Sequence, residues 1–216
     1  MPSVHRRHCL VALIGGVAVF TLPACSRKPI QGRPVAAGAK VLALGDSLTH
    51  GTGATPDTAF PAVLAGLTGW DVVNAGVPGH TSAQTLERAP GLLAEHQPSL
   101  VLLGIGGNDL LRRMDENQTR ANIRQTVDTV KASGAQLLLI AVPRPTLAAR
   151  FTGSLSDHPM YRELAEALQV PLHRQGWSDV LADDSLRADA IHANAAGHDK
   201  FARGLLATLR AAGLLV

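Results

Sequence analysis

Short apolar runs alternate with longer stretches of helical period from Lys40 to the end of the chain. Four runs, each bounded by Gly, Pro or Asn, predict strands at residues 41–44, 72–73, 100–105 and 137–142. Apolar residues at helical spacing predict helices at residues 59–67, 82–96, 118–133 and 161–169. A last helix is predicted to begin after the cap residue Asn194 and to end before Gly213.

This order of elements predicts the fold class. Strands that are apolar on both faces and separated by helices indicate a parallel sheet that helices cover on each side, with right-handed crossover connections. We therefore expect an α/β fold, a three-layer α/β/α sandwich with a central parallel sheet. Ligands of such sheets bind beyond the carboxyl ends of the strands, so the residues that directly follow each apolar run are the candidates for chemistry.

The start of the chain has the pattern of an export signal. A basic segment at residues 5–8 precedes an apolar run at residues 9–22, and these 14 residues are fewer than the roughly 20 that a spanning helix needs. We therefore expect residues 1–24 to be a signal peptide. Residues 25–39 are polar and interrupted by Pro and Gly, which predicts a flexible tether. Packing is then expected to begin near Lys40, with one domain at residues 40–216.

Composition agrees with one domain and argues against nucleic acid as a partner. A chain of 216 residues that is 46% apolar and 17% charged can bury the core of one compact domain. Without Arg6 and Arg7 of the expected signal peptide, 18 of the 20 Lys and Arg residues stand against 17 Asp and Glu, a net charge of about +1. No basic run follows Lys28, so neither a groove for phosphates nor a polybasic membrane patch is indicated.

A candidate nucleophile follows the first predicted strand. The run Gly45-Asp46-Ser47-Leu48 lies where a strand-to-helix turn would expose the Ser47 hydroxyl and aim backbone N–H groups at the same point. A serine hydroxyl is a weak nucleophile unless a nearby base takes its proton. The alternative is a simple turn in which Ser47 caps a helix, and this motif alone does not decide between the two.

Two further motifs contain candidate donors for a developing negative charge. Asn74-Ala75-Gly76 follows the second predicted strand, and Gly76 lets the backbone approach a ligand closely. Gly106-Gly107-Asn108-Asp109 follows the third strand and places the Asn108 amide where an oxyanion donor is useful. Ordinary turns and caps are the alternatives, while the spacing of a glycine-rich phosphate loop is absent.

A candidate base lies just before the last predicted helix, in Asp189-Ala190-Ile191-His192. The three-residue spacing lets the Asp189 carboxylate accept from one imidazole nitrogen of His192, so that the other nitrogen faces a serine. A surface pair is the alternative for this motif alone. His192 and His198 lack the HExxH spacing, and no cysteine follows Cys25, so we expect neither zinc nor a disulfide. The remaining scattered histidines, such as His50, His80 and His96, are interpreted as surface or loop residues.

Together, the four motifs resemble the four sequence blocks of the SGNH (GDSL-type) hydrolases. Within this family the chain is most similar to the multifunctional periplasmic thioesterase, lysophospholipase and arylesterase group, on segments such as LALGDSLTHG and VVNAGVPGHTS. The resemblance runs from about Lys40 to the C-terminus and implies a flavodoxin-like fold. The chain departs from that group at Ala190 and Ala193, where Gly and Pro are usual. The G-x-S-x-G elbow of another hydrolase fold is absent, because Thr49 occupies its last position.

The resemblance also implies a role for each candidate residue. Ser47 would be the nucleophile, with Asp189 and His192 as its relay partners. The oxyanion hole would consist of the Ser47 amide, the Gly76 amide and the Asn108 side chain. We therefore expect a monomeric serine esterase that needs no metal or cofactor. Its expected substrates are short-chain or aryl esters, acyl thioesters and lysophospholipids, cleaved through an acyl-enzyme on Ser47.

Two other functions stay open at this point. One is an O-acetyl esterase that acts on envelope polysaccharide, and the other is a non-catalytic envelope lipoprotein that binds lipid or glycan. A complete set of catalytic groups argues against the binder, which has no need of them. The unpatterned stretch at residues 144–159 is expected to line or cover the acyl site. Leu110, Leu111 and Met160 are candidates for acyl contact or for the core.

The run Leu22-Pro23-Ala24-Cys25 resembles a bacterial lipobox. Ordinary signal cleavage requires a small side chain three residues before the cut, where this chain has Leu22. The resemblance implies that the Cys25 thiol is acylated and anchors an exported lipoprotein in the cell envelope, facing the periplasm. Ser26 after the cysteine favours the outer membrane by the same resemblance. The alternative is a soluble secreted protein in which Cys25 has no such role.

Overall fold

The apolar runs form a five-stranded parallel sheet in the order β2-β1-β3-β4-β5. The computed structural model describes residues 30–144 and 155–215. The strands are β1 (Lys40–Gly45), β2 (Asp71–Gly76), β3 (Leu100–Gly104), β4 (Gln136–Ile140) and β5 (Leu172–His173). Every residue of β3 is buried, as a strand covered on both faces requires. The sequence did not predict β5, because two residues carry no period.

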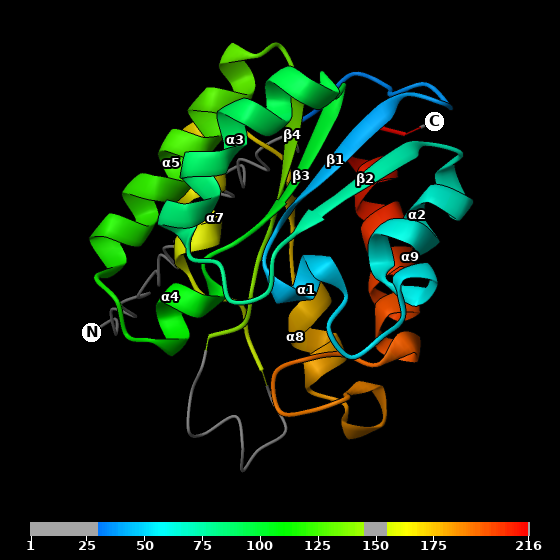
Figure 1. The fold of residues 1–216 in the computed structure, drawn as a ribbon, viewed down its shortest axis with the longest axis vertical. Coiled ribbons are helices and arrows are strands. Elements are labelled where there is room, and N and C mark those ends of the chain that lie inside the picture. The colour runs from blue at the N-terminus through cyan, green and yellow to red at the C-terminus, as the bar shows by residue number, and fades with distance from the viewer. Residues whose placement is uncertain (1–29, 145–154, 216) are drawn as a thin grey trace, which may run out of the picture.

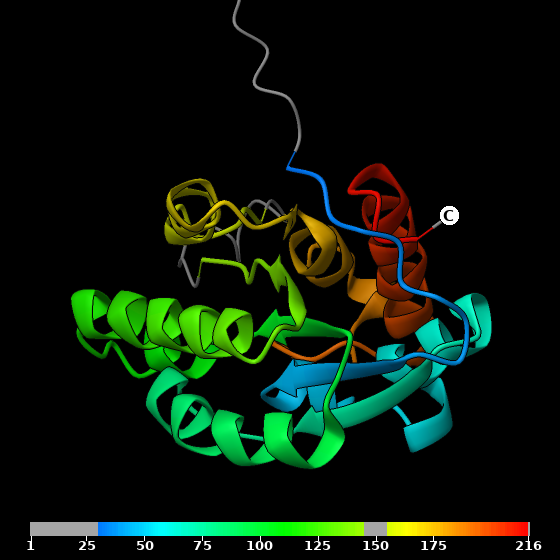
Figure 2. The same ribbon diagram turned by 90° about the horizontal axis from the view of Figure 1, so that it is seen from above.

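Helices cover both faces of this sheet, as Figures 1 and 2 show. One layer contains α3 (Ser82–His96), α5 (Glu116–Ala132) and α7 (Met160–Leu168), and the other contains α2 (Phe60–Thr68), α8 (Gly176–Leu181) and α9 (Ala195–Ala211). Two short helices, α1 (Ser47–His50) and α4 (Gly107–Leu111), lie beyond the carboxyl ends of β1 and β3. The 3-10 helices are η1 (Pro56–Thr58) and η2 (Asp184–Leu186). The predicted three-layer α/β/α sandwich is confirmed.

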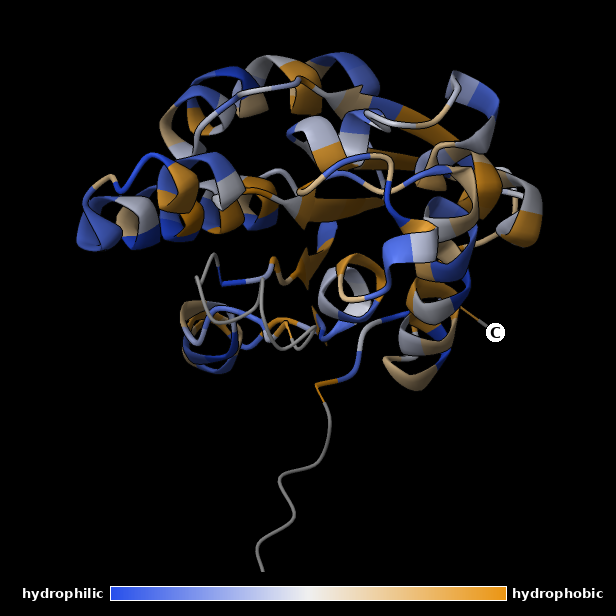
Figure 3. Ribbon diagram, turned by 90° about the horizontal axis from the view of Figure 1, so that it is seen from below, coloured by the Kyte–Doolittle hydropathy of each residue, from blue (hydrophilic) through white to orange (hydrophobic). Residues whose placement is uncertain are grey.

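Side chains at the helix ends explain where the longer helices begin. The Thr81 side chain accepts from the Gln84 N–H, and the Gln84 side chain accepts from the Thr81 N–H, a capping box at the start of α3. The predicted cap Asn194 accepts from the Gly197 N–H at 3.0 Å at the start of α9. In Figure 3 the strands are mostly hydrophobic, while the helices carry hydrophilic residues on their outer sides. Local caps and one-sided apolar faces therefore direct the helices onto the sheet.

The packed domain begins earlier than the sequence predicted. Val35 is only 6% exposed, its N–H donates to Leu214 O at 2.9 Å, and its carbonyl accepts from the Trp70 indole at 3.2 Å. The prediction of a tether up to residue 39 is therefore wrong for residues 30–39. This segment forms no helix or strand and is held by hydrogen bonds to distant parts of the chain, among them Leu214 and the Trp70 side chain. Composition does not reveal such bonds.

Several predictions concern residues that lie outside the described part of the chain. These are the signal peptide at 1–24, the lipidation site Cys25, the first residues of the tether and the central part of the expected acyl-site loop, 145–154. Among the residues that are described, no helix is both long and apolar enough to cross a bilayer.

Candidate active site

Ser47 is the first residue of α1, directly beyond the carboxyl end of β1. The Asp46 side chain caps this helix by accepting from the Leu48 N–H at 3.0 Å. The first N–H groups of a helix have no acceptor within the helix, so the Ser47 N–H is available at its N-terminus. The short helix thus presents a hydroxyl and a backbone donor at one point.

His192 and Asp189 lie in the loop between η2 and α9, far from Ser47 in the sequence. The Nε2 atom of His192 is 3.0 Å from Ser47 Oγ, and its Nδ1 atom is 2.7 Å from Asp189 Oδ2. The other carboxylate oxygen, Oδ1, accepts from the Ile191 N–H at 2.8 Å and the His192 N–H at 2.9 Å. The fold therefore brings together the serine, histidine and aspartate that the sequence singled out.

The surroundings of Asp189 keep its carboxyl group charged. Partial burial by itself raises the pKa, but the hydrogen bond from the His192 ring and those from two backbone N–H groups outweigh it and hold the pKa of Asp189 below its ordinary value. A charged Asp189 fixes the proton on Nδ1 of His192 and leaves Nε2 to accept from Ser47.

A cavity of about 250 Å³ opens beside this relay. Its polar lining includes Ser47, His192 and Asn108. Its apolar lining comes from Leu48, Pro78, Leu111 and Ile191. Leu111 and Ile191 are 47% and 43% exposed, so they border the opening. Of the other two candidates for acyl contact, Leu110 packs against the core and Met160 is fully buried in it. An apolar pocket with a few convergent polar groups suits a small ligand with an uncharged body.

Asn108 lies in α4, beyond the carboxyl end of β3. Its Nδ2 atom donates to His80 O at 3.0 Å, which orients the amide and leaves its second N–H for another acceptor. Asn108 also lines the cavity. The next residue, Asp109, is 1% exposed and accepts from the Ser82 N–H at 2.8 Å and the Ser82 hydroxyl at 2.5 Å. These bonds hold α4 against the start of α3.

Gly76 does not line the cavity, contrary to its predicted place in an oxyanion hole. Its N–H donates to Asn74 Oδ1 at 3.0 Å. A Cβ atom at this position would lie 2.1 Å from the backbone nitrogen of His50. Gly76 therefore allows α1 to pack closely against the end of β2, and its N–H is already occupied.

Gly79 lines the cavity instead. The His80 N–H donates to Val77 O at 3.1 Å, which closes a turn with Pro78 and Gly79 at its centre. Gly79 has φ +79°, the value that the third residue of a type II turn requires. Among the described residues, no acceptor binds the Gly79 N–H. The Pro-Gly dipeptide was the sequence signal for this turn, but nothing in it showed that the turn faces the site.

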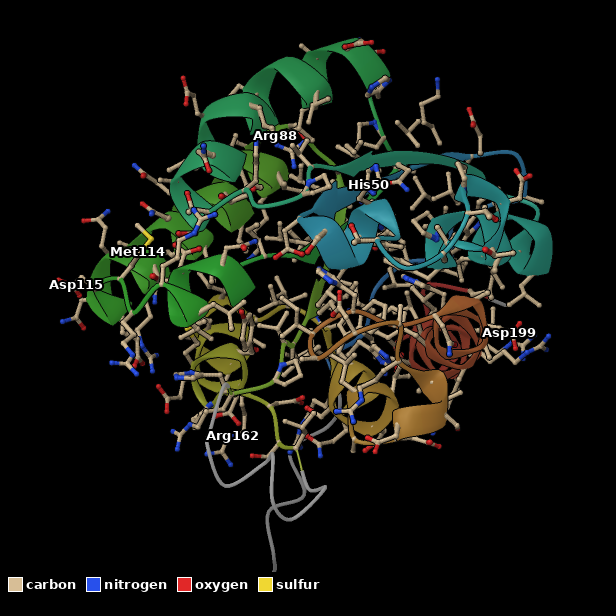
Figure 4. The ribbon with its side chains drawn as sticks, turned by 60° about the horizontal axis from the view of Figure 1, so that its bottom comes forward. His50, Arg88, Met114, Asp115, Arg162 and Asp199 are labelled. Carbon is tan, nitrogen blue, oxygen red and sulfur yellow. The ribbon has the colours of Figure 1, made fainter. Side chains whose placement is uncertain are left out.

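Two arginines hold the backbone around the site. The Arg112 guanidinium donates to Gly79 O at 2.9 Å. Arg88, labelled on α3 in Figure 4, donates to Gly45 O and Ala75 O, both at 2.7 Å. The ends of β1 and β2 and the turn after β2 are thus tied to α3 and α4.

Asp46 differs from Asp189 because it is almost fully buried. Burial raises the pKa of Asp46 to about 6, although the Leu48 N–H and the nearby His192 act in the opposite direction. Its side chain is 2% exposed and lines the cavity beside Ser47. The sequence did not identify this group, since a capping aspartate and a titrating one have the same local pattern.

The remaining histidines do not join the site as ligands or bases. His50 is exposed at the end of α1, and His80 and His96 are half-buried. In the two described stretches of the chain, no group of three or more His, Cys, Asp or Glu side chains is placed to hold a metal ion.

The proton of the Ser47 hydroxyl has a direct path to His192, and Asp189 lies ready to balance the charge that results. On a parallel α/β sheet, this arrangement defines a serine hydrolase. The chain belongs to the GDSL-like lipase/acylhydrolase family, whose model matches residues 43–200. The predicted family and the predicted esterase class are confirmed, and the protein is a hydrolase that acts on ester bonds.

Relatives in this family support the same conclusion. The chain is 38% identical over 165 residues to thioesterase 1/protease 1/lysophospholipase L1 of Escherichia coli K12, covering 74% of this chain and 77% of the relative. It is 32% identical over 184 residues to esterase TesA of Pseudomonas aeruginosa, covering 81% and 90%. A crystal structure of TesA superposes with a TM-score of 0.71 at 28% identity and covers 79% of this chain and 98% of that chain.

Asp46→Asn tests the burial of this carboxylate. The folded-state pKa of about 6 lies above the ordinary 3.8, so the unfolded chain binds fewer protons between these pH values and stability falls as pH rises through this window. The asparagine can still accept from the Leu48 N–H but cannot ionise. We compare the free energy of unfolding of Asp46→Asn with that of the wild type. Between pH 4 and pH 7.5 this difference should change by up to about 3 kcal/mol in favour of the variant.

Urea unfolding at both pH values measures this difference. The control is Asp57→Asn, which removes an exposed carboxylate and should change stability little at either pH. If Asp46→Asn changed the free energy of unfolding equally at pH 4 and pH 7.5, burial would not raise the pKa of Asp46.

Proposed function

We propose that the protein hydrolyses short-chain and aryl esters through an acyl-enzyme on Ser47. The observation that carries the proposal is the 3.0 Å contact between Ser47 Oγ and His192 Nε2, with Asp189 2.7 Å from the other ring nitrogen. These distances lie within the reach that general-base catalysis needs. The relay activates the hydroxyl because His192 Nε2 can accept its proton.

The reaction has two halves with the same groups. Ser47 Oγ forms a bond to the carbonyl carbon while His192 Nε2 takes the hydroxyl proton. The bond to the alcohol then breaks, and His192 returns the proton to the leaving oxygen. In the second half, water attacks the acyl carbon while His192 Nε2 accepts a proton from it. The bond between the acyl carbon and Ser47 Oγ then breaks, His192 returns the proton to Ser47 Oγ, and the carboxylic acid leaves.

The negative oxygen of the tetrahedral intermediate needs hydrogen-bond donors. We assign this role to the N–H groups of Ser47 and Gly79 and to the Nδ2 amide of Asn108, all of which belong to residues that line the cavity. Gly79 replaces Gly76 in this assignment because the Gly76 N–H is bound to Asn74. The bonds from Asn108 to His80 O and from Arg112 to Gly79 O fix two of the donors before substrate arrives.

The cavity favours a small acyl or aryl group. Its volume of about 250 Å³ and its lining by Leu48, Pro78 and Ile191 suit a short hydrocarbon body. The relatives named thioesterase, lysophospholipase and esterase make acyl thioesters and lysophospholipids further candidates. A series of p-nitrophenyl esters of increasing acyl length, with matching acyl thioesters and an acetylated glycan, measures the preference. Activity on the acetylated glycan alone would replace this substrate class with O-acetyl esters.

We also propose that the protein is exported and attached to the cell envelope through a lipid on Cys25, with the outer membrane as the site of attachment. The support is the sequence alone, namely the basic and apolar segments at residues 5–22 and the Leu22-Pro23-Ala24-Cys25 run followed by Ser26. We further propose that the protein acts as a monomer, because the relay and the three assigned donors all belong to this one chain.

The relay predicts non-additive losses. Ser47→Ala and His192→Ala should each lower kcat by on the order of 10⁴ to 10⁶, and the double variant should be no worse, because both residues serve one proton transfer. Steady-state hydrolysis of p-nitrophenyl butyrate measures this, with His96→Ala as a control that removes a histidine away from the site. If the double variant instead lost kcat by the product of the two single losses, Ser47 and His192 would not serve one proton transfer.

The oxyanion assignment predicts that Asn108→Ala lowers kcat by about 10²–10³ with little change in KM, because its donor acts on a charge that exists only in the transition state. Asn117→Ala, an exposed asparagine in α5, is the control. The measurements are kcat, KM and the melting temperature. A lower melting temperature with normal kcat would assign Asn108 to holding the turn at His80 only.

The anchor predicts that Cys25→Ser releases the protein from membranes while leaving the activity per molecule unchanged, since the lipid is attached far from the catalytic groups in the sequence. Cys9→Ser, at the other cysteine of the chain, is the matched control and should stay with the membranes. Sedimentation after a high-salt wash distinguishes the two. Continued sedimentation of Cys25→Ser would refute the anchor.

A further inference from the structure

The nucleophile and the base reside on two pieces of chain that share few hydrogen bonds. Within the described residues, the hydrogen bond between segment 46–55 and loop 186–194 is the Ser47–His192 contact itself. A single bond between flexible side chains does not hold two backbones at a fixed distance. Some other contact must set the separation of α1 and the loop that carries His192.

The loop that carries His192 is closed upon itself. The Ala188 N–H donates to His192 O at 2.9 Å, and Arg187 and Ala193 form an antiparallel bridge. The Asn194 N–H donates to Leu186 O at 2.8 Å, and its side chain donates to Ser185 O at 2.8 Å. At its end the loop is joined to α9, because Asn194 accepts from the N–H groups of Gly197 and His198. These bonds fix the shape of the loop and its attachment to α9, but they do not fix its distance from α1.

The chain after α1 is tied back to Ser47. The N–H groups of Gly51 and Thr52 both donate to Ser47 O, at 3.1 and 3.0 Å, and the Ala54 N–H donates to Gly51 O at 2.9 Å. Gly53 lies between these anchored residues. Its position is therefore linked to the backbone of the nucleophile.

Gly53 lies directly against the loop that carries His192. A Cβ atom at Gly53 would be 2.4 Å from Ala193 O and 2.7 Å from Ala188 Cβ. Ala193 follows His192 in the chain, and Ala188 is hydrogen-bonded to His192 O. Because Gly53 has no side chain, its backbone can lie against Ala188 and Ala193, which come before and after His192 in the chain.

We propose that Gly53 is a positioning residue that sets the distance between Ser47 and His192. The inference rests on the proposed serine mechanism and adds a residue to it. Because the nearest atom is a backbone oxygen, a methyl group at Gly53 can be accommodated only by displacing the loop or the segment after α1. Gly53 and Ala188 are exposed at the surface, whereas Ala193 is buried in the core, so the melting temperature of each variant is measured beside its activity.

Such a displacement acts on catalysis through the Ser47–His192 contact. General-base transfer needs heavy atoms about 2.6–3.2 Å apart, and the present distance of 3.0 Å leaves little margin. A misplacement of about 1 Å can lower the rate on the order of 10²-fold. The Asp189–His192 bond lies within the loop and moves with it.

The test compares Gly53→Ala with Gly134→Ala. Both glycines have positive φ, +96° and +87°, but a Cβ atom at Gly134 has no neighbour within 4 Å. The two variants therefore share the backbone strain and differ in the contact with the loop. We expect Gly53→Ala to lower kcat for p-nitrophenyl butyrate and the rate of fluorophosphonate labelling by on the order of 10²-fold with little change in KM, while Gly134→Ala keeps both rates.

Ala188→Gly supplies a second variant should Gly53→Ala be difficult to fold. It removes one of the two atoms that the new methyl group meets. The Gly53→Ala/Ala188→Gly double variant should therefore recover part of the kcat that Gly53→Ala loses. Equal kcat in Gly53→Ala and Gly134→Ala, or strictly additive effects of Gly53→Ala and Ala188→Gly, would overturn the proposal. Ser47→Ala is measured alongside. If the serine mechanism itself were wrong, Ser47→Ala would remain active, whereas a failure of the Gly53 proposal alone leaves Ser47→Ala inactive.

Discussion

The parallel pairing of β1 with both of its neighbours is the constraint on which the site depends. Gly45 pairs with Gly76 on one side and with Gly104 on the other, so three strands end at the same level. Their chain exits lead to α1, to the turn that contains Gly79 and to α4, in that order of the sequence. A shift of register by one residue would move one of these exits by about 3.3 Å, more than a hydrogen bond tolerates.

Polar groups buried behind the site make these exits rigid. Asp109 accepts from Ser82 through both its N–H and its hydroxyl, and the Asn122 amide donates to Ser82 Oγ at 3.0 Å. This network connects α3, α4 and α5, and Arg88 connects α3 to the strand ends. Buried polar groups that are satisfied in this way specify one arrangement, because any other leaves them without partners. The donors near the cavity are therefore held in place before substrate binds, which is what electrostatic stabilisation of a transition state requires.

Two carboxylates close to His192 have opposite environments. The side chain of Asp189 is 54% exposed, and its oxygens accept three hydrogen bonds, so its pKa is lowered. Asp46 is buried with one backbone donor, so its pKa is raised to about 6. Hydrogen bonding to the charged form dominates in the first case, and desolvation dominates in the second. The exposed aspartate is thus the one suited to stabilise the imidazolium, while the buried one caps the helix that carries the nucleophile.

The sequence by itself determined the alternation of strands and helices, the cap at Asn194 and the local motifs around Ser47 and His192, because each of these depends on neighbours within a few residues. It did not determine that residues 30–39 pack on the domain, because Val35 is held by backbone groups of distant segments. It also selected Gly76, whereas Gly79 is the glycine of this segment that lines the cavity. Gly76 is the last residue of β2 and Gly79 follows three residues later, so only the conformation of the turn and its contacts with α1 and α4 decide which N–H is free. Local patterns record the preferences of short segments, whereas the direction of a single N–H at a site is set by what packs against it.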